Sequence, residues 1–118
     1  MIISDKIEKF YCELINMRII TICGSLKFKK EMMIEAQKLS LKGFCVLTPI
    51  YPVIENIKIS KEELQFLKEE HFKKIELSDS IFVINKDNYI WDSTKSEIEY
   101  ARSLGKEIDY YVNNVNWW

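Results

Sequence analysis

The sequence predicts an α/β fold of the doubly wound, Rossmann- or flavodoxin-like type, with one four-stranded parallel sheet. Four short apolar runs rich in β-branched residues alternate with longer polar stretches of helical periodicity. Such alternation implies right-handed βαβ units, for which we expect the strand order 2-1-3-4. The runs are almost continuously apolar, which is typical of strands covered on both faces. The expected strands span residues 18–23, 44–49, 80–85 and 107–112.

An extra helix is predicted before the first strand, within residues 1–17. Its apolar side chains, spaced as on one helical face, are Ile7, Phe10, Tyr11 and Leu14. The amphipathic pattern is the reason for this assignment. Residues 18–118 then form one domain, because 118 residues are enough for a single core.

Three further helices are predicted between the strands. The first has apolar side chains at steps of three and four, at Phe28, Met32, Ala36 and Leu39, and stops at Gly43. After a loop at 50–59, which follows Pro49 and contains Pro52, the second helix opens with a capping box at Ser60–Glu63. Its inward stripe is expected at Leu64, Leu67, His71 and Ile75. The third carries Glu97, Ala101 and Leu104 and ends at Gly105.

Composition restricts the classes of partner. The net charge is −1, with 17 basic and 18 acidic residues interspersed, which disfavours binding to duplex nucleic acid or acidic membranes. There is no apolar run of membrane-spanning length and no secretory signal pattern, so we expect a cytoplasmic protein. The cysteines, Cys12, Cys23 and Cys45, lack C-x-x-C spacing, so neither a disulfide framework nor a zinc site is expected.

A ligand site is expected where the strand order reverses, beyond the carboxyl ends of the first and third strands. The loops leaving these strands, 23–30 and 85–97, both lead into helix N-termini that favour a phosphate or carboxylate. The candidate binding residues there are Gly24, Ser25, Lys27, Asn85, Asp92, Ser93 and Thr94. The G-x-G-x-x-G fingerprint is absent, which disfavours nicotinamide redox chemistry, and no cofactor is expected.

Glu97 and His71 are the two candidate catalytic side chains, and each has a structural alternative. Thr94-Lys-Ser-Glu97 fits a capping box, and by pattern alone capping is the favoured role of Glu97. Its stripe with Ala101, however, turns the carboxylate toward the sheet, where it could act as a catalyst. His71, the single histidine, is either a satisfied core residue or a proton donor just below the same rim.

Three blocks of the sequence resemble the nucleoside 2-deoxyribosyltransferase superfamily, with the small 2′-deoxynucleoside 5′-monophosphate N-glycosidases as the closest members. The blocks are "ITICGSLKFKKEMMIEAQKLSLKGFCVLTP", "HFKKIELSDSIFVIN" and "STKSEIEYARSLGKEI", and the resemblance covers about residues 18–112. It implies that Glu97 attacks C1′ of the sugar. It also implies that Gly24, Ser25, Ser93 and Thr94 hold the sugar or a 5′-phosphate, with no cofactor or metal.

The sequence departs from this family at two places. The family's aspartate that assists proton transfer falls on His71, and the acidic loop before the nucleophile is altered around Asp92. These departures leave two classes of function open. One is N-glycosidic cleavage or base transfer on a nucleoside or nucleoside monophosphate, and the other is a non-catalytic nucleotide-binding module.

Loops and the C-terminus supply the remaining expectations. Aromatic residues in the rim loops that could stack on a nucleobase or pack among themselves are Tyr51, Tyr89 and Trp91. Trp117 and Trp118 favour a subunit interface and hence a homodimer or larger assembly. By the family resemblance, a neighbouring subunit could lend one of Asn113, Asn114 and Asn116 to the site.

Overall fold

The computed structural model describes residues 2–112 of the 118-residue chain, with side chains from Asp5 onward. Four helices, four strands and two 3-10 helices (η) follow one another in the described part. They are α1 (Ile2–Asn16), β1 (Ile19–Gly24), η1 (Leu26–Phe28), α2 (Lys29–Leu41), β2 (Cys45–Leu47), α3 (Lys61–Leu77), β3 (Ser80–Ile84), η2 (Lys86–Asn88), α4 (Asp92–Ser103) and β4 (Glu107–Tyr110). All four predicted strands are confirmed, with bounds that differ by at most two residues.

The four strands form one sheet in the order β2-β1-β3-β4, and every neighbouring pair is parallel. The predicted fold class and strand order are therefore confirmed. β1 and β3 lie side by side at the centre, in register from Ile20 opposite Ser80 to Gly24 opposite Ile84. Their carboxyl ends meet at one edge of the sheet, which is the point where the strand order reverses.

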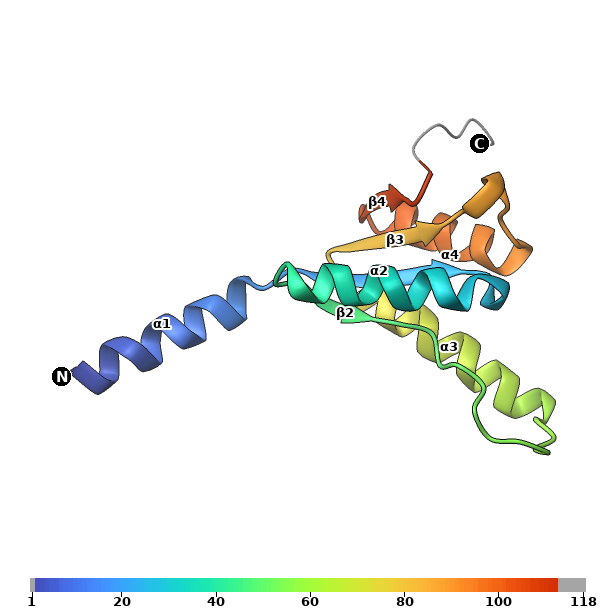
Figure 1. Cartoon of the computed structure of the whole chain (residues 1–118), viewed down its shortest axis with the longest axis horizontal. Helices are drawn as coiled ribbons and strands as arrows, with labels where there is room; N and C mark the ends of the chain where they lie inside the picture. The colour runs from blue at the N-terminus through green and yellow to red at the C-terminus, as the bar shows by residue number, and fades with distance from the viewer. Residues whose placement is uncertain (1, 113–118) are drawn as a thin grey trace.

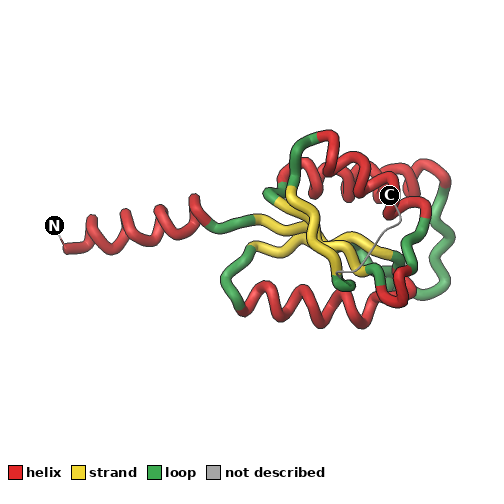
Figure 2. The backbone as a smooth tube through the Cα atoms, turned by 90° about the horizontal axis from the view of Figure 1, so that it is seen from above, coloured by secondary structure: helices red, strands yellow, loops and turns green. Residues whose placement is uncertain are grey.

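Helices cover both faces of the sheet (Figure 2). On one face α2 packs over a core of Ile22, Phe28, Met32 and Ile84. On the other, α3 and α4 enclose a core of Cys23, Ile75, Ile81, Val83, Ile98 and Ala101. Because alternate residues of β1 point to opposite faces, Cys23 faces α3 and α4, whereas Ile22 faces α2.

Polar contacts fix the C-terminal end of α3 against β1. The Thr21 hydroxyl donates to the backbone oxygen of Lys74 at 3.0 Å and also contacts the Ser78 hydroxyl, itself 2.7 Å from the same oxygen. Beyond the helix, the Asp79 carboxylate accepts the backbone N–H of Ile19 at 2.8 Å. The helix is thereby held in one register against the strand.

The first half of α3 extends past the sheet (Figure 1). Its predicted capping box is confirmed, with the Ser60 hydroxyl and the Glu63 carboxylate each 3.0 Å from the other's backbone nitrogen. The predicted burial of Leu64 and Leu67 is wrong, because they are 54% and 38% exposed. The helix stripe continues outward beyond the strands, where no sheet lies beneath it, and the loop at 50–59 runs alongside without regular structure.

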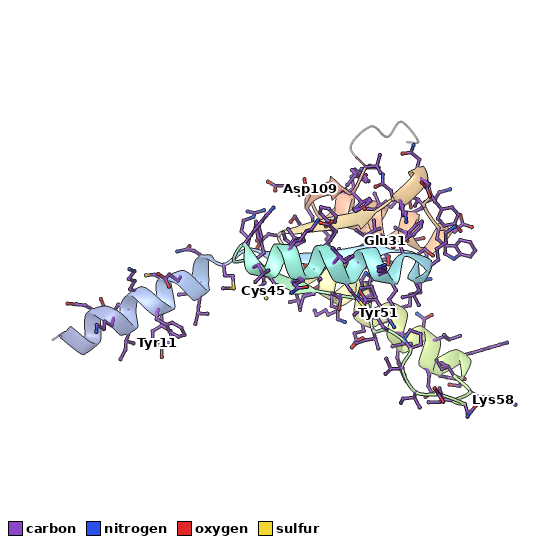
Figure 3. All side chains as sticks on the ribbon, in the orientation of Figure 1. Tyr11, Glu31, Cys45, Tyr51, Lys58 and Asp109 are labelled. Atoms are coloured by element: carbon purple, nitrogen blue, oxygen red, sulfur yellow. The ribbon has the colours of Figure 1, made fainter. Side chains whose placement is uncertain are left out.

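The helix α1 projects away from the sheet (Figures 1 and 3). The helix itself is predicted correctly, but its apolar stripe is open: Ile7, Phe10, Tyr11 and Leu14 are 46–57% exposed. Only Met17 and Arg18 separate α1 from β1. None of the helices in the described part of the chain combines the length and apolarity that crossing a membrane requires.

We expect a chain that begins at Met17 to fold as stably as the full chain, because the side chains of α1 from Asp5 onward are exposed. The free energy of unfolding measured in urea should change by less than about 0.5 kcal/mol, as for surface changes elsewhere. Loss of a cooperative transition in the shortened chain would show that α1 belongs to the domain after all.

Candidate active site

The carboxyl end of β1 forms the floor of the site. At its last residue, Gly24, a Cβ atom would lie only 3.2 Å from both the Cβ and the backbone oxygen of Ile84 on β3. Glycine therefore permits the close approach of the two central strands. One residue earlier, the fully buried Cys23 points toward the helices above.

The helix α4 carries Glu97 into the same region. The predicted capping box is wrong, because α4 begins at Asp92 and Glu97 lies in its second turn. The backbone N–H of Lys95 already bonds to the oxygen of Trp91 at 3.0 Å, so the helical pattern starts before Thr94. The inward orientation predicted for Glu97 is confirmed, since its side chain is only 14% exposed.

The helix α3 places His71 against Glu97. Nε2 of the imidazole lies 3.3 Å from Oε1 of the carboxyl group, and the two side chains are 11% and 14% exposed. The atoms are close but not aligned as a hydrogen bond. Both imidazole nitrogens and the second carboxyl oxygen also have no hydrogen-bond partner. The sequence left open whether His71 is a core histidine with its hydrogen bonds satisfied. The structure shows that these hydrogen bonds are not satisfied within the described residues.

Burial changes the protonation of both groups. It raises the pKa of Glu97 from 4.5 to about 8. Burial, with a smaller contribution from the Lys74 ammonium, lowers the pKa of His71 from 6.5 to about 4. In both cases loss of water disfavours the charged form. At neutral pH both groups are accordingly uncharged, with Glu97 as the protonated carboxylic acid and His71 as the neutral imidazole.

His71 and Glu97 open onto a cavity of about 320 Å³ at the carboxyl edge of the sheet. From the loops after β1 and β2 the lining residues are Gly24, Leu26, Pro49 and Ile50. From α3 and α4 they are Leu64, Leu67, Lys68, Glu70, His71, Phe72, Lys74, Ser93 and Glu97. Four of the residues predicted from the sequence, Gly24, His71, Ser93 and Glu97, are thus brought together.

The other predicted binding residues lie outside this lining. The Ser25 hydroxyl accepts the backbone N–H of Lys27 at 3.3 Å and caps η1. The amide of Asn85 is committed to the backbone of Val112, with bonds of 3.1 and 2.8 Å. The Asp92 side chain is 98% exposed and lies 3.8 Å from the Lys95 ammonium.

Thr94 and Lys27 differ from these three. Thr94 is 1% exposed, and its hydroxyl has no hydrogen-bond partner. The Lys27 ammonium lies 3.9 Å from the centre of the Tyr89 ring, a cation–π contact, and Tyr89 packs 6.0 Å from Trp91. Tyr89 and Trp91 are thus packed with each other, which is one of the two arrangements predicted for these aromatic residues.

Tyr51 lies on the segment after β2 (Figure 3), and its buried hydroxyl has no partner. Asn113, Asn114, Asn116 and the two terminal tryptophans lie outside the described residues.

The sequence reading missed two contributions to the site. Lys68 lies one turn before His71 on the cavity side of α3, a position that extending the stripe through i+3 and i+4 would have found. Cys23 is not among the site residues predicted from the sequence. Among the described residues, Cys23, His71 and Glu97 each bring one ligand atom within 4.8 Å of the others and could together hold a metal ion.

Comparison with known proteins relates the fold to solved structures. No protein-family model matches the chain, and no curated protein sequence is significantly similar to it. A 2-deoxyribosyltransferase from Bacillus psychrosaccharolyticus superposes with a TM-score of 0.64 at 21% identity, over 83% of this chain and 76% of that one. A 2-desoxiribosyltransferase from Leishmania mexicana gives 0.61 at 18% identity, over 84% and 67%.

A conserved protein from Enterococcus faecalis V583 has the same fold, with a TM-score of 0.58 at 16% identity. The match covers 83% of this chain but 65% of that one, slightly less than two thirds of its length. The class defined by fold and cavity is a doubly wound α/β domain with a cavity at its topological switch point. That fold is shared with solved 2-deoxyribosyltransferases.

We expect Glu97→Gln to stabilise the domain, and to do so more at about pH 8 than at about pH 5. In the folded chain Glu97 stays protonated up to about pH 8, whereas its ordinary pKa is 4.5. The stability that the protonated Glu97 carboxyl group contributes to the folded protein is therefore fully present below pH 4.5. That stability is lost as the pH rises from 4.5 through 8. The amide does not titrate, so the difference between the two proteins should grow by about 1–3 kcal/mol.

Urea unfolding in chelator-containing buffer at both pH values measures this difference. Because His71 is present in both proteins, its own titration largely cancels. Glu99→Gln is the matched control, since Glu99 carries the same carboxyl group on an exposed position of the same helix. A margin for Glu97→Gln that stays constant with pH would show that the Glu97 carboxyl group is ionised in the folded protein.

Proposed function

We propose that this chain cleaves the N-glycosidic bond of a nucleoside or nucleoside monophosphate, with Glu97 as the nucleophile at C1′ and His71 as the proton donor to the leaving base. One observation carries this proposal: an unsatisfied carboxyl group and an unsatisfied imidazole lie 3.3 Å apart in the wall of a ligand-sized cavity. Unpartnered buried polar atoms are costly, and a substrate that pairs with them gives their retention a reason.

The cavity suits a small polar ligand with a flat apolar part. Its volume of about 320 Å³ lies at the lower end of the usual range for small-molecule sites. The apolar side chains of Leu26, Ile50 and Leu67 line the cavity together with the polar groups of His71 and Glu97. Two solved structures with this fold are 2-deoxyribosyltransferases, which makes a nucleoside the substrate class that we favour.

Movement of the carboxyl proton of Glu97 can produce both the nucleophile and the proton donor. Transfer of the proton from Glu97 Oε1 to His71 Nε2, which are 3.3 Å apart, yields a carboxylate and an imidazolium at once. The carboxylate then bonds to C1′ as the C1′–N bond breaks, and the electron pair of that bond leaves with the base. The imidazolium proton passes to the base nitrogen, so the departing base is neutral.

The glycosyl ester is resolved by the reverse proton movement. Neutral His71 takes a proton from water, or from the N–H of a second base, and the resulting nucleophile attacks C1′ and frees the Glu97 carboxylate. The proton then returns from His71 to Glu97. The same residues therefore serve hydrolysis or base transfer, and the acceptor that reaches the cavity decides between them.

A second candidate function is nucleotide binding without turnover. It is favoured by the raised pKa of Glu97, about 8, which keeps the carboxyl group protonated at neutral pH. A protonated carboxyl group donates hydrogen bonds to a ligand but does not attack carbon. The activity experiments below separate the two functions, because a sensor binds nucleotides and releases no base.

We expect Glu97→Gln to lower base release by about 10³-fold or more, since losses of this size follow removal of a nucleophile. Free base is measured by chromatography on a panel of ribo- and deoxyribonucleosides and their 5′-monophosphates. We propose that Lys68, which lines the cavity, binds a 5′-phosphate, because the other cavity lysine, Lys74, already donates to the Thr48 oxygen at 2.8 Å. Faster base release from the 5′-monophosphates than from the nucleosides in the panel would support this role.

Glu99→Gln is again the control, because its exposed carboxylate lies outside the cavity lining and should leave base release unchanged. If Glu97→Gln retained the parental rate on the best substrate, Glu97 would not be the nucleophile. If the parent bound nucleotides and released no base from any of them, the sensor function would stand instead.

We expect His71→Gln to slow base release by about 10²–10⁴-fold, the usual contribution of general acid catalysis. The loss should be largest for bases that must be protonated to leave. It should be small for a deoxyribosyl compound with a nitrophenolate leaving group, which departs without a proton. Equal losses on both kinds of substrate would mean that His71 positions Glu97 and does not donate the proton.

A further inference from the structure

The floor of the cavity brings together three different metal-ligating atoms. Cys23 at the end of β1, His71 on α3 and Glu97 on α4 each place one ligand atom within 4.8 Å of the other two. The cysteine is completely buried, and His71 is 9% exposed as a residue. Neither imidazole nitrogen has a hydrogen-bond partner, and one carboxyl oxygen also lacks one. The cluster is thus buried and convergent, and three of its nitrogen and oxygen atoms have no hydrogen-bond partner.

We propose that Cys23, His71 and Glu97 bind Zn²⁺ at the floor of the cavity, and that the bound ion blocks the site. Binding of the ion is independent of the function proposed above. The inhibition rests on that function, because a metal ion that takes the lone pair of Glu97 removes the nucleophile.

The kinds of ligand select the ion. Thiolate, imidazole and carboxylate together suit Zn²⁺, whereas Mg²⁺ and Ca²⁺ require oxygen ligands almost throughout. Three protein ligands leave the fourth tetrahedral position open, as in catalytic zinc sites. Because His71 and Glu97 both line the cavity, we expect that position to face it.

The distances are compatible with coordination after small side-chain rotations. Bonds to zinc of about 2.0–2.3 Å in a tetrahedral arrangement place ligand atoms roughly 3.3–3.8 Å apart. His71 Nε2 and Glu97 Oε1 already lie 3.3 Å apart, and the Cys23 sulfur must approach by about 1 Å at most to bring every separation into this range.

Charge balance favours the ion in this buried place. A thiolate and a carboxylate carry two negative charges, which Zn²⁺ neutralises, and His71 binds as the neutral imidazole. A metal ion deprotonates a coordinating thiol outright, so the burial of Cys23 does not prevent binding. A buried centre without net charge avoids the large desolvation cost of an uncompensated ion.

The second imidazole nitrogen of His71 has no partner among the described residues. Zinc-binding histidines usually donate this N–H to an acceptor that fixes the ring. Because no such acceptor is present among the described residues, we expect weaker binding of Zn²⁺ here than at a structural zinc site. An ion that exchanges is what reversible inhibition requires.

Direct binding of Zn²⁺ to the full chain tests the site without reference to activity. Calorimetric titration of the metal-free parent should show one ion per chain. Cys23→Ser should weaken binding by about tenfold or more, since even second-shell partners of a ligand contribute 10–100-fold. Cys45→Ser is the matched control. Cys45 pairs with Ile19 at the opposite end of the sheet (Figure 3), about 13 Å along the strand from Cys23.

Co²⁺ provides a second readout on the same proteins. The parent and Cys45→Ser should show a thiolate-to-cobalt charge-transfer band in the near ultraviolet, which Cys23→Ser should lack. If Cys23→Ser does not unfold cooperatively, Cys23→Ala replaces it in both measurements. Unchanged Zn²⁺ affinity and an unchanged cobalt band in the Cys23 variant would overturn the proposed site.

Base release measured with and without Zn²⁺ tests the inhibition. Within each protein, the ratio of the two rates should fall with Zn²⁺ for the parent and Cys45→Ser but much less for Cys23→Ser. Unchanged base release at saturating Zn²⁺ would overturn inhibition. A parent that binds Zn²⁺ through Cys23 but releases no base even without metal would support the metal site and contradict the proposed enzyme.

Discussion

The chemistry of this domain depends on the burial of His71 against Glu97 without a hydrogen bond that offsets their loss of water. Their closest atoms lie 3.3 Å apart, and three of their four polar side-chain atoms, counting both nitrogens and Oε2, have no partner. Each such atom costs about 1–3 kcal/mol relative to a satisfied one. The same burial raises the pKa of Glu97 and lowers that of His71, so the pair is held as two neutral groups. The cost to stability and the neutral state of both groups therefore have one cause.

The rest of the fold explains how this pair is maintained. Thr21 and Ser78 tie the end of α3 to β1, two turns of helix below His71. Gly24 lets β1 approach β3 closely, and it also lines the cavity at the carboxyl end of β1. Ile98 and Ala101, buried on α4, press that helix against the sheet and turn Glu97 inward. The apolar contacts of three elements thus offset what the polar pair costs.

Much of this arrangement could be predicted from sequence, and the failures have physical reasons. Continuous apolar runs identify buried parallel strands, and the periodicity of α4 orients Glu97 correctly. The capping box failed because local pattern does not define where a helix starts; the bond from Lys95 to Trp91 begins α4 earlier. The burial of Leu64 failed because periodicity marks a face but not how far the sheet extends beneath it. The amide of Asn85 binds the backbone of Val112, 27 residues away, and no local signal indicates such a contact.

The cluster of Cys23, His71 and Glu97 has no spacing in the sequence that would indicate it. Ligand spacing in sequence detects metal sites built on one hairpin or helix, whereas β1, α3 and α4 contribute one atom each to this cluster. In the two proposals above, the Glu97 carboxyl group has three alternative partners, which are its own proton, the sugar of the substrate and a metal ion, and each of them excludes the other two. We therefore expect the proposed metal ion to compete with the proposed substrate, because an ion bound to Glu97 removes the free carboxylate.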